Sequence, residues 1–317
     1  MSILLALSAC TLDLGAFTRS QPLTETVVLG ESGPKILMLE LEGLLTESPR
    51  RRALGTAPSL VARAREALER AREDDDVAAV LLRIRSPGGT VAASETLYHL
   101  IEQFKKETGR PVTAQLQGLA TSGGYYVAMA ADHIVAHPTT ITGSIGVLLA
   151  GVNVAGLMEK LGIQNQTLTS AEFKDAGSPL RPMRPDERAQ LQSVIDDLYA
   201  RFREVVAAGR PSLDEAAIAK LADGRIFTAR QALAAGLIDE IGYLEDSVAE
   251  TERRAGIEHS RVVVYHSPRE YKQNLYSRAP VGPLQVVDVH LLDLGRQWIP
   301  PGFWYVWPPA LGNGLHP

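Results

Sequence analysis

Short apolar runs and amphipathic stretches alternate along the first half of the chain. Residues 36–43, 78–84 and 112–117 are short and rich in apolar side chains, which predicts buried strands. Residues 60–72 and 97–104, which lie between these runs, carry their apolar side chains at helical spacing. Such an alternation of strands and helices predicts an α/β architecture.

Further helices are predicted in the middle of the chain. Residues 124–131 follow the third strand directly, and residues 186–209 form a long amphipathic stretch. Two capping boxes, in which Ser or Thr stands three residues before Glu or Gln, predict two more helix starts. These boxes are Ser212 with Glu215 and Thr228 with Gln231. We see no internal sequence duplication in these segments.

Length and composition exclude some classes of protein. The 317 residues suit one large domain or two small ones. With 45% hydrophobic residues and a formal net charge of -5, the composition is that of a soluble globular protein. The chain has neither a basic stripe nor the ligand spacing of a zinc site, so we expect no nucleic-acid partner, no metal and no cofactor.

Ser122 is the most informative residue of the sequence. It lies between the strand 112–117 and the helix 124–131, where backbone N–H groups are unpaired and favour an anion. A serine is a poor nucleophile without a neighbouring base. His133 and His137 follow it but read as structural or exposed residues. Ser122 is therefore either a helix N-cap or a nucleophile with another base.

Two other features suggest catalytic chemistry. A Gly88-Gly89 turn opens the helix that contains residues 97–104, and such a turn can aim an N–H group at an oxyanion or simply connect a strand to a helix. It lacks the Lys-Ser/Thr ending of a phosphate loop. Lys174 is the candidate base, because a lysine amine can accept a proton where its surroundings lower its pKa. Otherwise Lys174 is a solvated surface residue.

Several segments together resemble the signal peptide peptidase A family, the Ser-Lys serine proteases of bacterial envelopes. They run in family order from about Lys35 to Asp239. The segments are 82–89 (LRIRSPGG), 121–126 (TSGGYY), 132–147 with its TGSIGV end, 173–179 (FKDAGSP) and 223–239 with its DGRIFTARQA start. The resemblance implies the Clp protease/crotonase fold, a superhelix of ββα units, in its single-repeat form.

The same resemblance implies a role for each candidate residue. Ser122 would be the nucleophile and Lys174 the general base. The N–H groups of Gly89 and Ser122 would form the oxyanion hole, and Ser144 would orient the lysine amine. Arg85 departs from the family, in which asparagine is commoner before Ser-Pro-Gly-Gly, and could alter the rim of the cleft.

The resemblance also implies a function and an assembly. We expect a serine endopeptidase that degrades cleaved signal peptides or other hydrophobic peptides in the bacterial envelope. We expect a ring-like homo-oligomer, an octamer, whose active sites are shared between neighbours. The alternatives are a crotonase-like acyl-CoA enzyme, which would need neither Ser122 nor Lys174, and a non-catalytic envelope scaffold.

The two ends of the chain differ from its body. Residues 1–22 read as a leader or an anchor stub, in which Cys10 follows Leu-Ser-Ala and is a candidate for lipidation. Residues 23–270 would form the peptidase domain, and 271–317 a Pro- and aromatic-rich extension that straps the domain or meets a membrane interface. We expect membrane association on the extracytoplasmic side, with a cytoplasmic location as the alternative.

Overall fold

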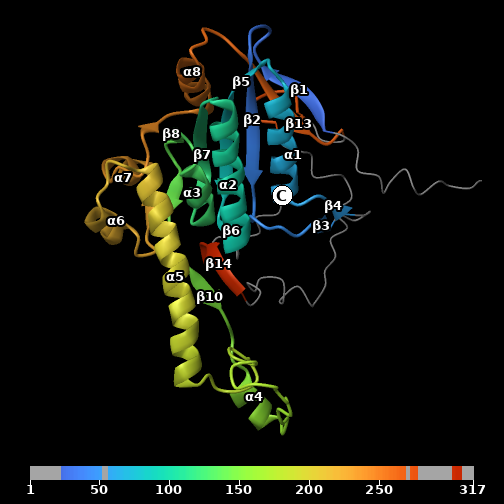
Figure 1. Cartoon of the computed structure of the whole chain (residues 1–317), viewed down its shortest axis with the longest axis vertical. Coiled ribbons are helices and arrows are strands. Elements are labelled where there is room, and N and C mark those ends of the chain that lie inside the picture. Colours follow the sequence, from blue (N-terminus) through green and yellow to red (C-terminus); the bar gives the residue numbers. More distant parts are fainter. Residues whose placement is uncertain (1–22, 52–55, 269–271, 278–301, 309–317) are drawn as a thin grey trace, which may run out of the picture.

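The computed structural model describes residues 23–51, 56–268, 272–277 and 302–308, and Figure 1 shows how their helices and strands are arranged. The strands are β1 (Thr24–Leu29), β2 (Lys35–Glu42), β3 (Arg50–Arg51), β4 (Thr56–Ala57), β5 (Val77–Ser86), β6 (Gly88–Thr90), β7 (Val112–Thr121), β8 (His133–Ala136), β9 (Ile141–Gly143), β10 (Leu148–Ala150), β11 (Ile226–Thr228), β12 (Glu240–Ile241), β13 (Arg261–His266) and β14 (Gly302–Val306). The helices are α1 (Leu60–Glu73), α2 (Val91–Thr108), α3 (Gly123–Ala128), α4 (Ala155–Lys160), α5 (Pro185–Gly209), α6 (Glu215–Leu221), α7 (Ala229–Ala234) and α8 (Leu244–Ala255).

Within the described residues, a nine-stranded sheet forms the centre of the molecule. Its main path runs β1-β13-β2-β5-β7-β8-β12, and β9 pairs with both β7 and β11. The strands β13, β2, β5, β7, β8 and β12 are parallel to their neighbours, whereas β1 is antiparallel to β13. The α/β architecture predicted from the alternation is therefore confirmed.

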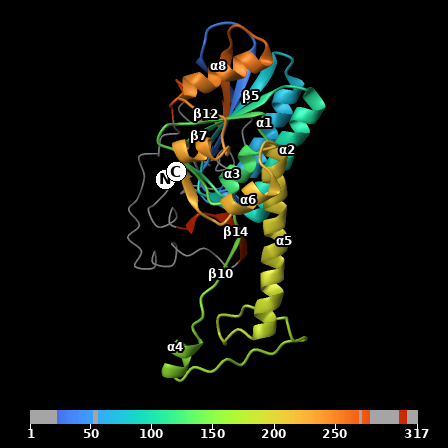
Figure 2. The same ribbon diagram turned by 90° about the vertical axis from the view of Figure 1, so that its left-hand side faces the viewer.

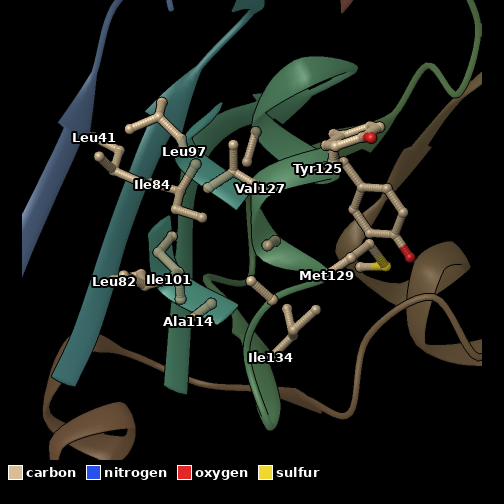
Figure 3. Packing of buried hydrophobic residues seen from close by; sticks show 14 of the residues in the cluster. Leu41, Leu82, Ile84, Leu97, Ile101, Ala114, Tyr125, Val127, Met129 and Ile134 are labelled. Atoms are coloured by element: carbon tan, nitrogen blue, oxygen red, sulfur yellow. The ribbon is translucent and has the colours of Figure 1, made fainter. Parts of the chain in front are cut away.

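The continuous apolar runs of the strands are explained by burial of both faces of the sheet. In β2, Leu37 and Leu41 belong to the cluster that includes residues of α1, α2 and α3. Ile36 and Met38, which point the other way, pack instead with residues of α8. Strands covered on both faces lose the polar alternation of half-exposed strands. Figure 3 shows the larger cluster.

The helices that cover the sheet begin and end at recognisable residues. The Ser59 side chain accepts a hydrogen bond from the Ala62 N–H group at the start of α1, and Gly109 ends α2 in the left-handed conformation. The predicted capping box of α7, between Thr228 and Gln231, is confirmed. The one predicted from Ser212 is wrong, because the next residue but one, Asp214, caps α6.

The part of the chain that the structure describes also contains a three-stranded sheet and a projecting arm. The strands of the small sheet follow the order β10-β14-β6, and β14 comes from the far C-terminal part of the sequence. Residues 151–184, which contain α4, lie beyond the end of α5 that points away from the central sheet (Figures 1 and 2). We call residues 151–184 the arm and the rest of the described residues the body. No helix of the described residues is long and apolar enough to cross a membrane.

Two predictions concern residues that the structure does not describe. The leader or anchor stub 1–22, with Cys10, lies outside the described residues, and so does most of the predicted extension 271–317. Residues 302–308 of that extension are described, and Trp304 and Tyr305 are buried in the body. This part of the extension agrees with the interpretation as a strap.

Candidate active site

Ser122 directly follows β7 and has a strained backbone conformation. Its φ of 52° is positive, and among the described residues Ser144 (φ 53°) is the only other non-glycine residue with a positive φ. The strain is fixed by pairing, because the Ser122 N–H group donates to the Gly143 carbonyl (2.7 Å) and the Ser144 N–H group donates to the Arg225 carbonyl (2.7 Å). Strained residues that the surrounding structure holds in place cluster at functional sites.

The hydroxyl of Ser122 does not cap the helix that follows it. Ser122 occupies the N-cap position of α3, but its side chain makes no capping hydrogen bond. The residue is 1% exposed, and its Oγ atom has no hydrogen-bond partner within the described part of the chain. A buried hydroxyl without a partner costs free energy, about 1–3 kcal/mol. The structural explanation of Ser122 as an N-cap is thus not supported by the geometry.

The predicted glycine turn lies directly beside this serine. The Ser86 hydroxyl accepts a hydrogen bond from the Gly88 N–H group (3.0 Å), and Gly88 has a φ of 103°, which a side chain would strain. A Cβ atom built on Gly88 would lie 2.8 Å from the Gly123 nitrogen, and one built on Gly123 would lie 3.1 Å from the Gly89 nitrogen. The amides of Gly89 and Gly123 therefore converge on one small space.

The structure differs from the prediction at one oxyanion donor. The Ser122 N–H group, predicted as a donor with that of Gly89, is occupied by the Gly143 carbonyl. The next amide in the chain, that of Gly123, lies at the N-terminus of α3 beside Gly89. Sequence reasoning missed this residue, although a glycine directly after the candidate nucleophile was a visible signal.

Ser144 lies close to Ser122 because β9 pairs with the end of β7. In the parallel register, Thr121 is opposite Gly143, so the two serines follow two directly paired residues. Ser144 is 7% exposed. The structure therefore brings Ser122, Ser144 and Gly89 into one region.

Lys174 is not brought to Ser122 within one chain. It lies in the arm, in which no residue is buried, and its own side chain is exposed. The arm is tied to the start of α5 by Arg181, which pairs with Asp175 and with Glu187. Phe202 of α5 contacts α3, and it follows Glu187 by 15 positions, which is a rise of about 22 Å along the helix.

The contact at the other end of α5 defines how far the arm is from the serine. The Phe202 ring lies 4.9 Å from the ring of Tyr126, whose N–H group bonds the Ser122 carbonyl (2.8 Å). Phe202 therefore contacts a residue that lies one helical turn after Ser122, whereas the arm joins α5 at the opposite end of the helix (Figure 2).

The two histidines that follow Ser122 lie on β8 and in the loop after it. The His133 ring is 3.5 Å from the Glu240 carboxylate and bonds Arg254, and the His137 ring packs edge-on against Tyr243. Strand β8 pairs with the first half of β7, away from its serine end. In the part of the chain that the structure describes, no three His, Cys, Asp or Glu residues could together hold a metal ion.

The chain is similar to known peptidases. The model of Peptidase family S49 matches residues 104–258. The "Putative protease slr0021" of Synechocystis sp. is 38% identical over 228 residues, which are 72% of this chain and 77% of the relative. The "Putative signal peptide peptidase SppA" of Enterococcus faecium is 34% identical over 76% of this chain and 70% of its own. "Protease 4" of Haemophilus influenzae is 34% identical over 69% of this chain, but only 34% of its own length is covered.

Proposed function

Because the chain belongs to peptidase family S49, and its α/β fold is accordingly of the Clp protease/crotonase type, we propose that it is a serine endopeptidase with a Ser-Lys dyad. Ser122 is the nucleophile and Lys174 the general base. The observation that carries the proposal is the buried Ser122 hydroxyl, which has no partner in the described residues. Its residue has a strained backbone and directly precedes Gly123, whose amide nitrogen lies close to Gly89.

In this mechanism each residue has one task. The neutral Lys174 amine takes the proton of Ser122 as its Oγ atom attacks the peptide carbonyl. The amides of Gly89 and Gly123, with the positive end of α3, stabilise the negative oxygen of the tetrahedral intermediate. The protonated amine then gives its proton to the leaving amine, and a water molecule releases the acyl group from Ser122. Ser144, which lies next to Ser122, positions the amine.

An active-site label tests these roles. A serine-directed phosphonate should attach to Ser122 in the unmodified protein, as peptide mass spectrometry would show. Lys174→Ala should abolish labelling, since the hydroxyl then lacks a base. Lys160→Ala is the matched control, because Lys160 is another exposed lysine of the arm, and it should label normally. Labelling that survives in Lys174→Ala at neutral pH contradicts the Ser-Lys assignment.

We propose further that each active site is shared between two protomers of a ring, an octamer. Two observations support this. First, Lys174 lies in the arm, past the end of α5 that is farther from Ser122 of the same chain. Second, the arm exposes many apolar side chains. Eight of the fourteen large apolar side chains that are exposed in the described residues belong to it: Val152, Leu157, Leu161, Ile163, Leu168, Phe173, Leu180 and Met183. A second copy of the chain would cover this surface and receive the lysine.

Complementation distinguishes a shared site from a self-contained one. Ser122→Ala and Lys174→Ala chains are mixed in equal amounts and reassembled. If sites are shared, each site takes its serine from one chain and its lysine from a neighbouring chain. In a random assembly, half of the sites have an intact serine and half of those also receive an intact lysine. About a quarter of the wild-type activity should therefore return. If both residues act in one chain, no site is complete and no activity returns, provided that subunit exchange has been shown separately.

The substrates that we propose are cleaved signal peptides or other hydrophobic peptides of the bacterial envelope. The relative from Enterococcus faecium carries the name of a signal peptide peptidase, which supports this class. A crotonase-like acyl-CoA enzyme remains the alternative on the same fold, and turnover of a CoA thioester that persists in Ser122→Ala would favour it. A scaffold would show neither activity.

We also propose attachment to the extracytoplasmic face of the membrane through Cys10. The support is the Leu-Ser-Ala-Cys pattern. Mass spectrometry of the protein from a membrane fraction, produced with a complete leader, should find acyl mass on Cys10. An unmodified protein in the soluble fraction would contradict this.

A further inference from the structure

Lys174 is followed directly by a residue that an arginine holds. The guanidinium group of Arg181 binds both carboxylate oxygens of Asp175 (2.6 and 2.8 Å) and also donates to the Asp175 carbonyl oxygen (3.2 Å). A bidentate pair fixes the relative orientation of two side chains as well as their distance. The backbone on the C-terminal side of the lysine is therefore fixed relative to Arg181, while the lysine itself is exposed.

A second arginine holds the residues that precede Lys174. Arg184 donates to the Glu172 carbonyl oxygen (3.0 Å), and its guanidinium group lies over the Phe173 ring, 5.6 Å from the ring centroid. A guanidinium group in this place is attracted by the negative face of the ring. The two contacts hold the N-terminal side of the lysine, so residues 172–175 are fixed on both sides of it.

The two arginines meet at one buried carboxylate. Glu187, in the first turn of α5, is fully buried and accepts hydrogen bonds from the Arg181 guanidinium group (2.9 Å) and from the Arg184 backbone N–H group (3.0 Å). Its carboxylate also pairs with the Arg184 guanidinium group (3.0 Å). A buried charge has to be paired, so Glu187 keeps both arginines in place. We call Arg181, Arg184 and Glu187 the clamp.

The clamp joins the lysine segment to the helix that reaches the body. No residue of the arm is buried, so apolar packing within the chain does not hold this segment. The helix α5 is continuous from the clamp to Phe202, which packs on α3. A general base has to lie within about 2.6–3.2 Å of the group whose proton it takes. A lysine on a loose segment would meet this requirement only part of the time.

We propose that Arg181, Arg184 and Glu187 are positioning residues for the general base. They hold residues 172–175 on the end of α5, so that this helix delivers the Lys174 amine to the serine of the neighbouring protomer. The inference rests on the proposed function and on the shared site. Because the clamp acts through the base, its loss should slow the chemical step and leave the binding of the peptide intact.

The placement of one substitution in the complementation mixture tests this role. Arg181→Ala is added either to the Ser122→Ala chain, which supplies the lysine of every complete site, or to the Lys174→Ala chain, which supplies the serine. In the first mixture, activity should fall at least about tenfold below that of the two single variants, because the working base is misplaced. In the second mixture, activity should stay within about twofold. An equal fall in both mixtures, or a fall in neither, would overturn the proposal.

Steady-state kinetics of the uniform variant proteins give a readout that does not depend on whether sites are shared. Arg181→Ala and Arg184→Ala should each lower kcat for a peptide about ten- to a hundredfold and change KM by less than about threefold. Arg188→Ala is the matched control, since this exposed arginine follows Glu187 directly, and it should keep both constants. Unchanged kcat, or a loss that appears only as a higher KM, would overturn the proposal.

Hydrogen exchange in the full chain separates failure of the clamp from failure of the proposed function. Three amides in the segment 174–178 donate hydrogen bonds to carbonyl groups three residues earlier. These amides should exchange several-fold faster in Arg184→Ala than in the unmodified protein or in Arg188→Ala. Equal exchange in the three folded proteins would overturn the clamp. If the unmodified protein cleaves no peptide and Ser122 is not labelled, the proposed function fails, while exchange still decides whether the clamp holds the lysine segment.

Discussion

The body and the arm are stabilised by different interactions, although each supplies one member of the proposed dyad. Ser122 lies in the body, is itself buried, and directly follows β7, most of whose residues are buried. Lys174 lies in the arm, in which none of residues 151–184 is buried. What holds the arm is polar, chiefly Arg181 with Asp175 and Glu187.

This difference separates two tasks of the proposed enzyme. The body fixes the nucleophile and the oxyanion donors rigidly, as pre-organised catalysis requires. The arm presents the base away from its own serine and exposes an apolar surface that a second copy can cover. Completion of the site then depends on assembly, so an isolated chain would hold a prepared serine without a base.

The largest effect is expected from removal of either member of the dyad. Ser122→Ala and Lys174→Ala should each lower kcat/KM for a peptide by about 10³-fold or more, because residues that act as a unit fail together. The double variant should be about as inactive as either single one. Thermal unfolding should change little for Lys174→Ala, since that side chain is exposed. Retained activity in either single variant would contradict the proposal that the body supplies the nucleophile and the arm supplies the base.

A core substitution should distinguish the stability of the two regions. Leu97→Ala, at a fully buried position of α2, should lower the free energy of unfolding by about 2–5 kcal/mol. Leu168→Ala, in the arm at 97% exposure, should change it by no more than about 0.5 kcal/mol. Denaturant titration of both variants measures this. A similar cost for the two leucines would show that the arm has a core of its own.

Loss of the central arginine should affect the arm alone. Arg181→Ala leaves Asp175 and Glu187 without their main partner, so amides of the arm should exchange several-fold faster, while those of β5 and β7 should keep their protection. Arg188→Ala is the matched control, since this arginine is exposed on the first turn of α5. Faster exchange in the body as well would indicate that the two regions unfold together.

The smallest effect is expected from acid. Hydrogen bonds from Arg181 lower the pKa of both Glu187 and Asp175 below their ordinary values of about 4. Groups with a lowered folded-state pKa stabilise the fold above the unfolded-state value, and this contribution is lost as the pH falls through the lowered values. Pepsin should therefore begin to cut the arm below about pH 4, before it cuts the body. Arg181→Ala should remove this pH dependence, and a body that is cut first would contradict the assignment.

The sequence determined the features that depend on local pattern. Strand and helix positions followed from apolar runs and helical spacing, which directly reflect burial. The placement of Ser122 at a strand-to-helix turn and of Gly88 and Gly89 at a second turn also followed, because a glycine pair and a helix start are local signals. The resemblance carried by these motifs indicated the family, and the comparisons confirm it.

Only the tertiary structure decided which groups meet across long stretches of chain. The pairing of the Ser122 amide with Gly143, which leaves Gly123 as the amide beside Gly89, depends on the register of β7 and β9. The insertion of β14 beside the glycine turn and the separation of Lys174 from Ser122 depend on how distant segments pack. A pattern of neighbouring residues records whether a side chain is buried, but it does not record which distant strand or which protomer lies against it.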